Sequence, residues 1–139
     1  MKVPTPVLHA AVITTGVVVL FWFGRRGPWT PMRIAGAALM LGGYLGWLSA
    51  RLQLGGSFAI QPRAKELVTR GVYSKIRNPI YVFGSLLIIG ILLYISRPIW
   101  LLTFVVLIPL QVWRAHKEAK VLEEKFGEAY REYRKKTWF

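Results

Sequence analysis

The sequence predicts an all-α integral membrane protein with about four transmembrane helices and a C-terminal amphipathic cytoplasmic helix. Four stretches contain no Lys, Arg, Asp or Glu: 6–24, 34–50, 79–96 and 98–113. Each is near the length of about 20 apolar residues that a helix needs to cross a hydrocarbon core. The hydrophobic fraction of 54% is above that of most soluble domains. At 139 residues, the chain has room for a single domain, which we place at 1–139.

The first two stretches are predicted to be retained membrane helices. Stretch 6–24 is too long for the apolar region of a secretory signal, and no A-x-A cleavage pattern follows it. In stretch 34–50, Gly42 and Gly46 have the small-xxx-small spacing that lets two helix backbones approach closely. We expect these glycines to pack against another helix, with a dimer contact or a cofactor as alternatives.

The third and fourth stretches are separated only by Arg97 and Pro98. Proline ends a helix at the preceding residue and is well tolerated in the first turn of the next one. The pattern therefore predicts a helical hairpin. Stretch 98–113 is short for a span, so we expect it to be tilted little, to lie partly at the interface, or to continue into the helix that follows.

The distribution of basic residues predicts the orientation. Of the 19 Lys and Arg, fifteen lie at Lys2, in the loop 51–78 and in the tail 114–139, and four lie on the opposite side. Because basic residues accumulate in cytoplasmic loops, both termini are predicted to be cytoplasmic. The net charge of +13 therefore indicates a membrane partner, and no motif for nucleic-acid binding accompanies it.

The tail changes to helical periodicity after the last span. Apolar residues recur at steps of three and four while Lys, Arg and Glu occupy the other face: Ala115, Ala119, Leu122, Phe126, Ala129 and Tyr133. Gly127 predicts a kink or a break in this amphipathic helix. The helix is expected to act as an interfacial anchor or as a lid over a pocket.

Several function classes are disfavoured by residues that the sequence lacks. There is no Cys, and all six acidic residues are Glu outside the four stretches. A proton-coupled exporter or an acidic channel needs a carboxylate within the membrane. His9 and His116 are far apart in sequence, so no metal site is predicted. Motifs of nucleotide-binding and hydrolytic enzymes are also absent.

Three blocks of residues between 61 and 135 carry a resemblance. Leu67 to Tyr73 read LVTRGVY, and Arg77 to Tyr81 read RNPIY. A third block places Arg, Glu, Leu, Phe-Gly and two Tyr at fixed spacing: Arg114, Glu118, Leu122, Phe126, Gly127, Tyr130 and Tyr133. Together these blocks resemble the membrane family of isoprenylcysteine carboxyl methyltransferases and phospholipid methyltransferases. Asn78 stands where the family often has His, and Ala119 stands where it often has a second Glu.

The resemblance implies S-adenosyl-L-methionine as the cofactor and a lipid or lipidated small molecule as the acceptor. It implies that Glu118 binds the cofactor and that Arg114, one helical turn earlier, faces the acceptor. The other implied cofactor-binding residues precede or begin the third stretch: Gln61, Leu67, Val68, Tyr73, Asn78, Pro79, Ile80 and Tyr81. The oligomeric state stays open.

The chemistry of the cofactor fits these residue types. Its sulfonium, ammonium and carboxylate call for an anion, a cation and an aromatic wall, which Glu118, Arg77 and the pair Tyr73 and Tyr81 supply. Few residues are candidate bases, which favours a carboxylate acceptor or an amine that is already neutral. The alternative function is a noncatalytic membrane protein, a transporter or an assembly factor, in which the same tyrosines are interfacial anchors.

Overall fold

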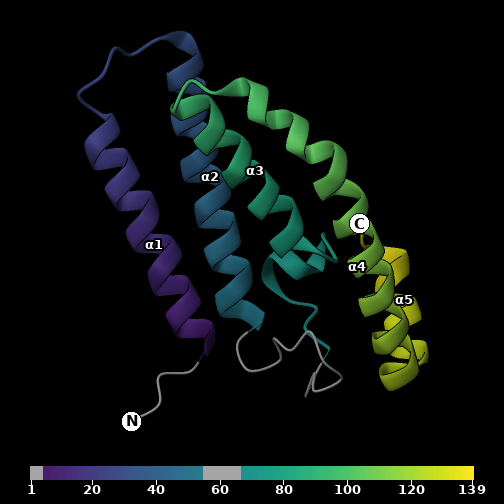
Figure 1. Ribbon diagram of the computed structural model, residues 1–139. Coiled ribbons are helices and arrows are strands. Elements are labelled where there is room, and N and C mark those ends of the chain that lie inside the picture. The colour runs from purple at the N-terminus through teal and green to yellow at the C-terminus, as the bar shows by residue number, and fades with distance from the viewer. Residues whose placement is uncertain (1–4, 55–66) are drawn as a thin grey trace.

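The computed structural model describes residues 5–54 and 67–139, and all of the regular secondary-structure elements in them are helices. Helices α1 (Thr5–Gly24), α2 (Pro31–Leu54) and α3 (Pro79–Tyr94) run alternately up and down (Figure 1). A 3-10 turn, η2 (Gly71–Ser74), precedes α3, and another, η3 (Pro98–Thr103), follows it. Helix α4 (Phe104–Phe126) then returns alongside and leads to α5 (Glu128–Lys136). The predicted all-α architecture is confirmed for this part of the chain.

Helices α2 and α3 form the packed centre of the molecule, because glycines remove the side chains that would separate their backbones. A Cβ at Gly43 would lie 2.8 Å from Leu87 Cα, and one at Gly90 would lie 2.6 Å from Met40 Cα. Gly46 adjoins the Phe83 ring, whereas nothing lies within 4 Å of the Cβ position at Gly42. The expected glycine packing is present, but Gly43 takes part in it in place of Gly42.

Helix α1 packs Ile13, Val17 and Leu20 against the core of this pair and adds polar contacts at its C-terminal end and midway along it. The Tyr94 hydroxyl donates to the Phe21 carbonyl at 3.0 Å, and the Arg33 guanidinium donates to the Gly24 carbonyl. Midway, the hydroxyls of Thr14 and Tyr44 lie 2.8 Å apart. Since polar groups in lipid must find partners inside the protein, these contacts fix the position of α1 along α2.

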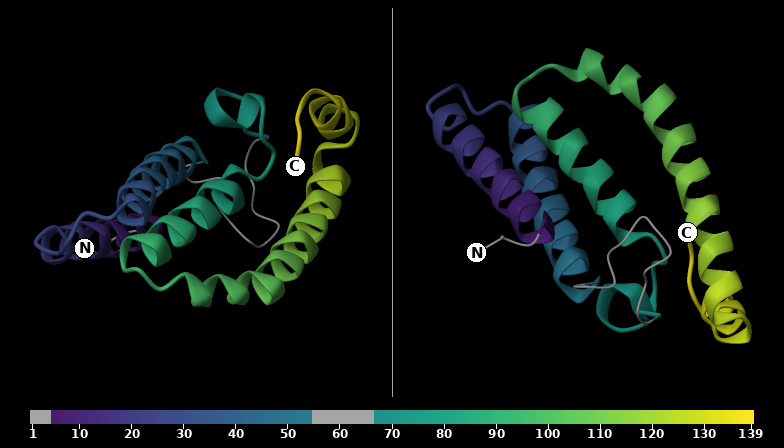
Figure 2. Two further views of the ribbon diagram at one scale, coloured as in Figure 1. Left: turned by 90° about the horizontal axis from the view of Figure 1, so that it is seen from above. Right: turned by 60° about the horizontal axis from the view of Figure 1, so that its bottom comes forward.

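Helix α4 is one continuous helix from the apolar stretch into the basic tail, so the fourth stretch extends into the following helix, as one of the three alternatives predicted. It bows away from α3 (Figure 2). Pro109 inside it cannot donate a backbone hydrogen bond, which accounts for a bend. Helix α4 ends at Gly127, where φ is 55° and ψ is −123°, and α5 begins at the next residue. The predicted break at Gly127 is confirmed.

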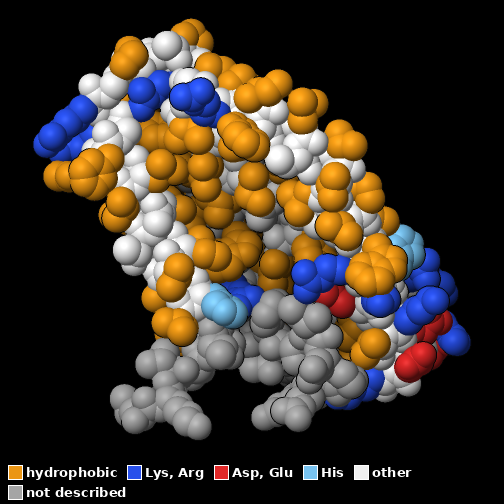
Figure 3. Space-filling view, in the orientation of Figure 1, with side chains coloured by type: hydrophobic (Ala, Val, Ile, Leu, Met, Phe, Trp, Pro, Cys, Tyr) orange, Lys and Arg blue, Asp and Glu red, His pale blue; other side chains and the backbone are white. Residues whose placement is uncertain are grey.

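Two helical segments of the described residues are long and apolar enough to cross a membrane, Val7–Gly24 and Pro98–Phe126. Helix α3 is shorter, at 16 residues, and α2 has Arg33 and Arg51 near its ends. Large apolar side chains are exposed along α1 and α4 and form much of the surface in Figure 3. The structure therefore supports membrane association with two candidate spans, and the count of four remains a prediction.

Candidate functional site

The start of α3 is the point where distant parts of the chain meet. The η2 turn is anchored on α2, because the Val72 amide donates to Gln53 Oε1 at 2.9 Å. After η2, Ile76 forms an isolated parallel β-bridge with Trp138. The Asn78 amide donates to the Phe139 carbonyl at 2.8 Å. The segment before α3 is thus held by α2 on one side and by the residues after α5 on the other.

Two hydrogen bonds join α3 to α4. The Tyr81 hydroxyl donates to Glu118 Oε1 at 2.5 Å, and Arg114 interacts with the same tyrosine side chain. One turn further along α3, the Ser85 hydroxyl donates to Gln111 Oε1 at 3.1 Å. The spacing of four residues on α3 and seven on α4 keeps each pair on the facing sides of the two helices.

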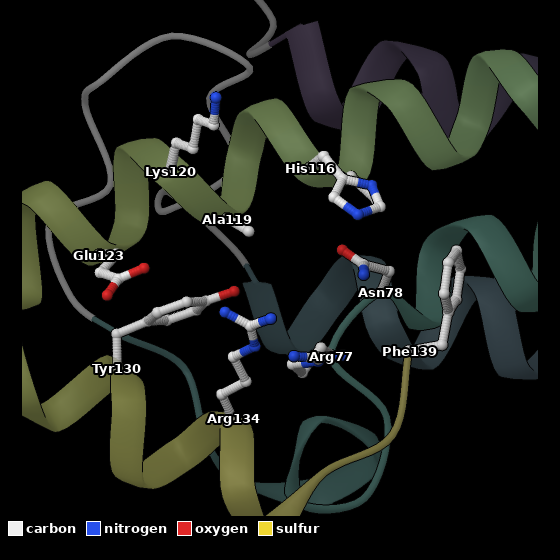
Figure 4. A pocket seen from close by; sticks show the side chains of 10 residues that line it. Arg77, Asn78, His116, Ala119, Lys120, Glu123, Tyr130, Arg134 and Phe139 are labelled. Carbon is white, nitrogen blue, oxygen red and sulfur yellow. The ribbon is translucent and has the colours of Figure 1, made fainter.

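A cavity of about 250 Å³ lies beside this junction, between α4, α5 and the start of α3. Its lining is rich in polar and cationic groups: Arg77, Asn78, Ala115, His116, Ala119, Lys120, Glu123, Tyr130, Arg134 and Phe139. In Figure 4, His116 points from α4 toward the side where Asn78 lies, whereas Tyr130 and Arg134 reach in from α5. The small residues Ala115 and Ala119, one turn apart on α4, leave room near Asn78.

The charge of the cavity is mostly positive. Glu123 contributes a carboxylate, but its Oε1 already lies 2.8 Å from Nε of Arg131. Arg77 has a buried Nε with no hydrogen-bond partner among the described residues. An unpaired buried cationic donor is costly, so this atom is suited to an anionic group of a ligand.

The tyrosines that support the cavity are held neutral. Burial, together with the neighbouring Tyr130, raises the pKa of Tyr133 to about 12. The Tyr133 hydroxyl donates to the Tyr73 carbonyl at 2.8 Å and so fixes α5 to η2. Burial also raises the pKa of Tyr130 and of Tyr73 above their usual range. These side chains therefore act as hydrogen-bond donors at neutral pH and not as bases.

The sequence matches the family described as phospholipid methyltransferase over residues 31–129. The chain belongs to that family. The match includes α2, which the sequence resemblance had not covered, and it confirms the family predicted from the motifs. No curated protein and no solved structure matches the chain. Membership indicates a methyltransferase that acts on a lipid-type acceptor in association with a membrane.

The structure brings together five of the residues predicted for the site. Arg77 and Asn78 line the cavity, and Tyr81, Glu118 and Arg114 form the polar cluster at the adjoining face of α4. Arg114 and Glu118 are four residues apart on one helix, so an ordinary surface ion pair is the alternative interpretation. Glu118 is half-buried and bonded to another helix, so that alternative does not describe it.

The other described residues that were predicted for the site do not line the cavity. Val68 and Tyr73 are buried in a cluster with Ala50, and Ile80 packs against that cluster. Pro79 is fully buried, and Leu67 is half-buried. These residues support the start of α3, and a direct contact of each with a cofactor remains a prediction. Gln61 lies outside the described residues.

Sequence reasoning missed the contribution of α5 and of His116. Tyr130 was recognised in the motif without a role, and Arg134 and Phe139 were not singled out, yet all three line the cavity. In the sequence, the only indication of where these three residues lie was the apolar periodicity of the tail and its break at Gly127. His116 was considered only as a metal ligand, because nothing in the sequence shows that it faces Asn78.

Proposed function

We propose that this protein transfers a methyl group from S-adenosyl-L-methionine to a lipid-like acceptor at the cytoplasmic membrane face. The acceptor is an isoprenylcysteine-type carboxylate or a phospholipid amine. The observation that carries the proposal is the tie between Tyr81 on α3 and Glu118 on α4, beside a cationic cavity at the start of α3. It joins motif residues that are 37 positions apart in the sequence.

The residues present fit the charged parts of the cofactor. The Glu118 carboxylate can accept from an ammonium while Tyr81 holds it in place. The buried Nε of Arg77 is a donor for a carboxylate, and Asn78 offers both a donor and an acceptor. When bound, the cofactor supplies an electrophilic methyl group on a positively charged sulfur.

The protein's contribution is to hold donor and acceptor in line and to exclude water. Arg114 is proposed to orient the acceptor, because it lies one turn before Glu118 and beside Tyr81. The bow in α4 leaves α3 and α4 without extensive packing, so an acceptor can approach sideways from the bilayer (Figure 2). The basic loop and tail support a cytoplasmic position for the site.

Calorimetric titration of the detergent-solubilised protein with S-adenosyl-L-methionine tests the proposal. Glu118→Gln should weaken binding at least tenfold, equivalent to about 1.4 kcal/mol. Glu124→Gln, an exposed position on the same helix, is the matched control and should bind as the unsubstituted protein does. Flat heats with the unsubstituted protein would contradict cofactor binding, and unchanged affinity in Glu118→Gln would remove Glu118 from the site.

A further inference from the structure

His116 is positioned to act as a base in the cavity. Its Nδ1 lies 2.7 Å from the Val112 carbonyl oxygen, one turn earlier on α4. A carbonyl oxygen can only accept, so when the ring is neutral its one proton is on Nδ1. Nε2 is then the nitrogen with the free lone pair, and the ring that carries it lines the cavity opposite Asn78 (Figure 4).

The other ionisable groups of the cavity lining cannot take this role. Arg77, Lys120 and Arg134 are cations, and the hydroxyl of Tyr130 is kept protonated by burial. Glu123, on the same helix, has one carboxylate oxygen paired with Arg131 at 2.8 Å, and a carboxylate is ordinarily a weaker base than an imidazole. Among the described residues of the lining, His116 therefore offers the more basic lone pair.

We propose that His116 is the general base that deprotonates an ammonium acceptor before methyl transfer. This inference rests on the proposed function and narrows its acceptor to a lipid with a protonated amine headgroup. A carboxylate acceptor has no proton to lose and needs no such base.

The proposed reaction consists of a proton transfer followed by a methyl transfer. The ammonium N–H bond breaks, and its proton moves to Nε2 of His116, which becomes an imidazolium. The freed nitrogen lone pair forms a bond to the methyl carbon of the sulfonium donor, and the carbon–sulfur bond breaks with its electron pair left on sulfur. The exposed edge of the His116 ring then releases the proton to water.

The test is the pH profile of kcat for His116→Gln with a primary-amine phospholipid as the acceptor. Loss of a general base should lower kcat about 100-fold at pH 7. The loss should shrink as the pH rises toward the acceptor's own pKa, and added imidazole should restore part of the rate. Cofactor affinity should stay unchanged. His9→Gln removes the chain's other imidazole and serves as the matched control, with an unchanged profile.

A kcat that is unaffected, or lowered equally at every pH, would overturn the role of His116. Activity confined to a prenylated cysteine carboxylate would do the same. A readout without turnover comes from NMR of the ring nitrogens of His116, which should show the Nδ1–H form and shift when a long-chain alkylamine is added. If the amine leaves the NMR signal of the His116 ring unchanged, the result counts against the inference even when the cofactor binds. If the ring signal shifts but titration with S-adenosyl-L-methionine gives no heat of binding, the result counts against the proposed function alone.

Discussion

The pair α2–α3 and the arm α4–α5 are held in different ways. Backbone against backbone, α2 and α3 meet through Gly43 and Gly90, with the buried side chains of Met40 and Leu87 between them. The arm is tied to α3 by side-chain hydrogen bonds, to η2 by a tyrosine hydroxyl, and to the segment before α3 by backbone hydrogen bonds of Trp138 and Phe139. Close packing is rigid, whereas a few directional contacts can open and reform.

The pair α2–α3 and the arm α4–α5 carry different residues of the proposed site. Of the residues proposed to bind the cofactor, Arg77 and Asn78 lie at the start of α3, beside the rigid pair, while Glu118 lies on the arm together with Arg114 and His116. Opening the arm would separate these two sets and closing it would assemble them. An acceptor that enters from the bilayer needs such an opening, and methyl transfer needs the closed, water-poor arrangement.

The largest effect is expected for Gly43→Ala, which would disrupt the close packing of α2 against α3. The new Cβ would lie 2.8 Å from Leu87 Cα, and backbone cannot move aside as a flexible side chain can. We expect a loss of about 3 kcal/mol of unfolding free energy, measured by thermal or denaturant unfolding in detergent. Gly42→Ala is the adjacent control and should gain up to about 1 kcal/mol, because its Cβ meets nothing within 4 Å. Equal effects at the two positions would contradict the packing.

Gly127→Ala should weaken the arm alone. At φ 55° and ψ −123° an alanine is strained by about 2 kcal/mol, although no neighbour within 4 Å would clash with it. Hydrogen exchange should rise in α5 and in the segment that pairs with Trp138, while α2 and α3 keep their protection. Uniform loss of protection across all helices would show that the arm is not a separate unit.

Tyr133→Phe should have a smaller effect at the same place. It removes the donor to the Tyr73 carbonyl and should cost about 1 kcal/mol. Proteolysis of the tail should become faster, which gel analysis of limited digests would detect. Tyr44→Phe is a comparable loss of one tyrosine hydroxyl on α2 and should leave tail proteolysis unchanged.

The pH dependence of the unfolding free energy tests the same hydrogen bond, from the Tyr133 hydroxyl to the Tyr73 carbonyl. The pKa of Tyr133 is raised to about 12 in the folded protein, so folding favours its neutral form. Its contribution is complete below the unfolded pKa of about 10 and is lost as the pH rises from there through about 12. Unfolding in detergent should therefore show no change from Tyr133 between pH 6 and 9, and a loss above about pH 10 that is smaller in Tyr133→Phe. A loss near neutral pH would contradict the burial of this hydroxyl.

Much of the rigid half could be predicted from the sequence, because length and hydropathy fix helices. The stretches without charge became α1, α2 and α3 within a few residues, and Pro98 and Gly127 marked real boundaries. The choice between Gly42 and Gly43 could not be made, because it depends on the rotation of α2 against α3. Sequence spacing gives neighbours on one helix but not the face that a second helix covers.

The site was predictable in its motif and less so in its geometry. The resemblance placed Tyr81 and Glu118 in one predicted site, and the structure joins them by a hydrogen bond that the sequence did not predict. The role of Tyr73 differs from expectation in one respect, because its carbonyl holds α5 in place. His116 and Arg134 enter the cavity only through the fold of the arm, for which the sequence carries no pairing signal.

The central claim is that the junction of α3 and α4 transfers a methyl group from S-adenosyl-L-methionine to a lipid. The most direct measurement is incubation of the purified protein with cofactor carrying a labelled methyl group and a total lipid extract, followed by identification of the labelled species. We expect the labelled methyl group to appear in a lipid fraction, with a strong reduction in Glu118→Gln and no loss in Glu124→Gln. Label that never reaches a lipid, although the cofactor binds, would contradict it.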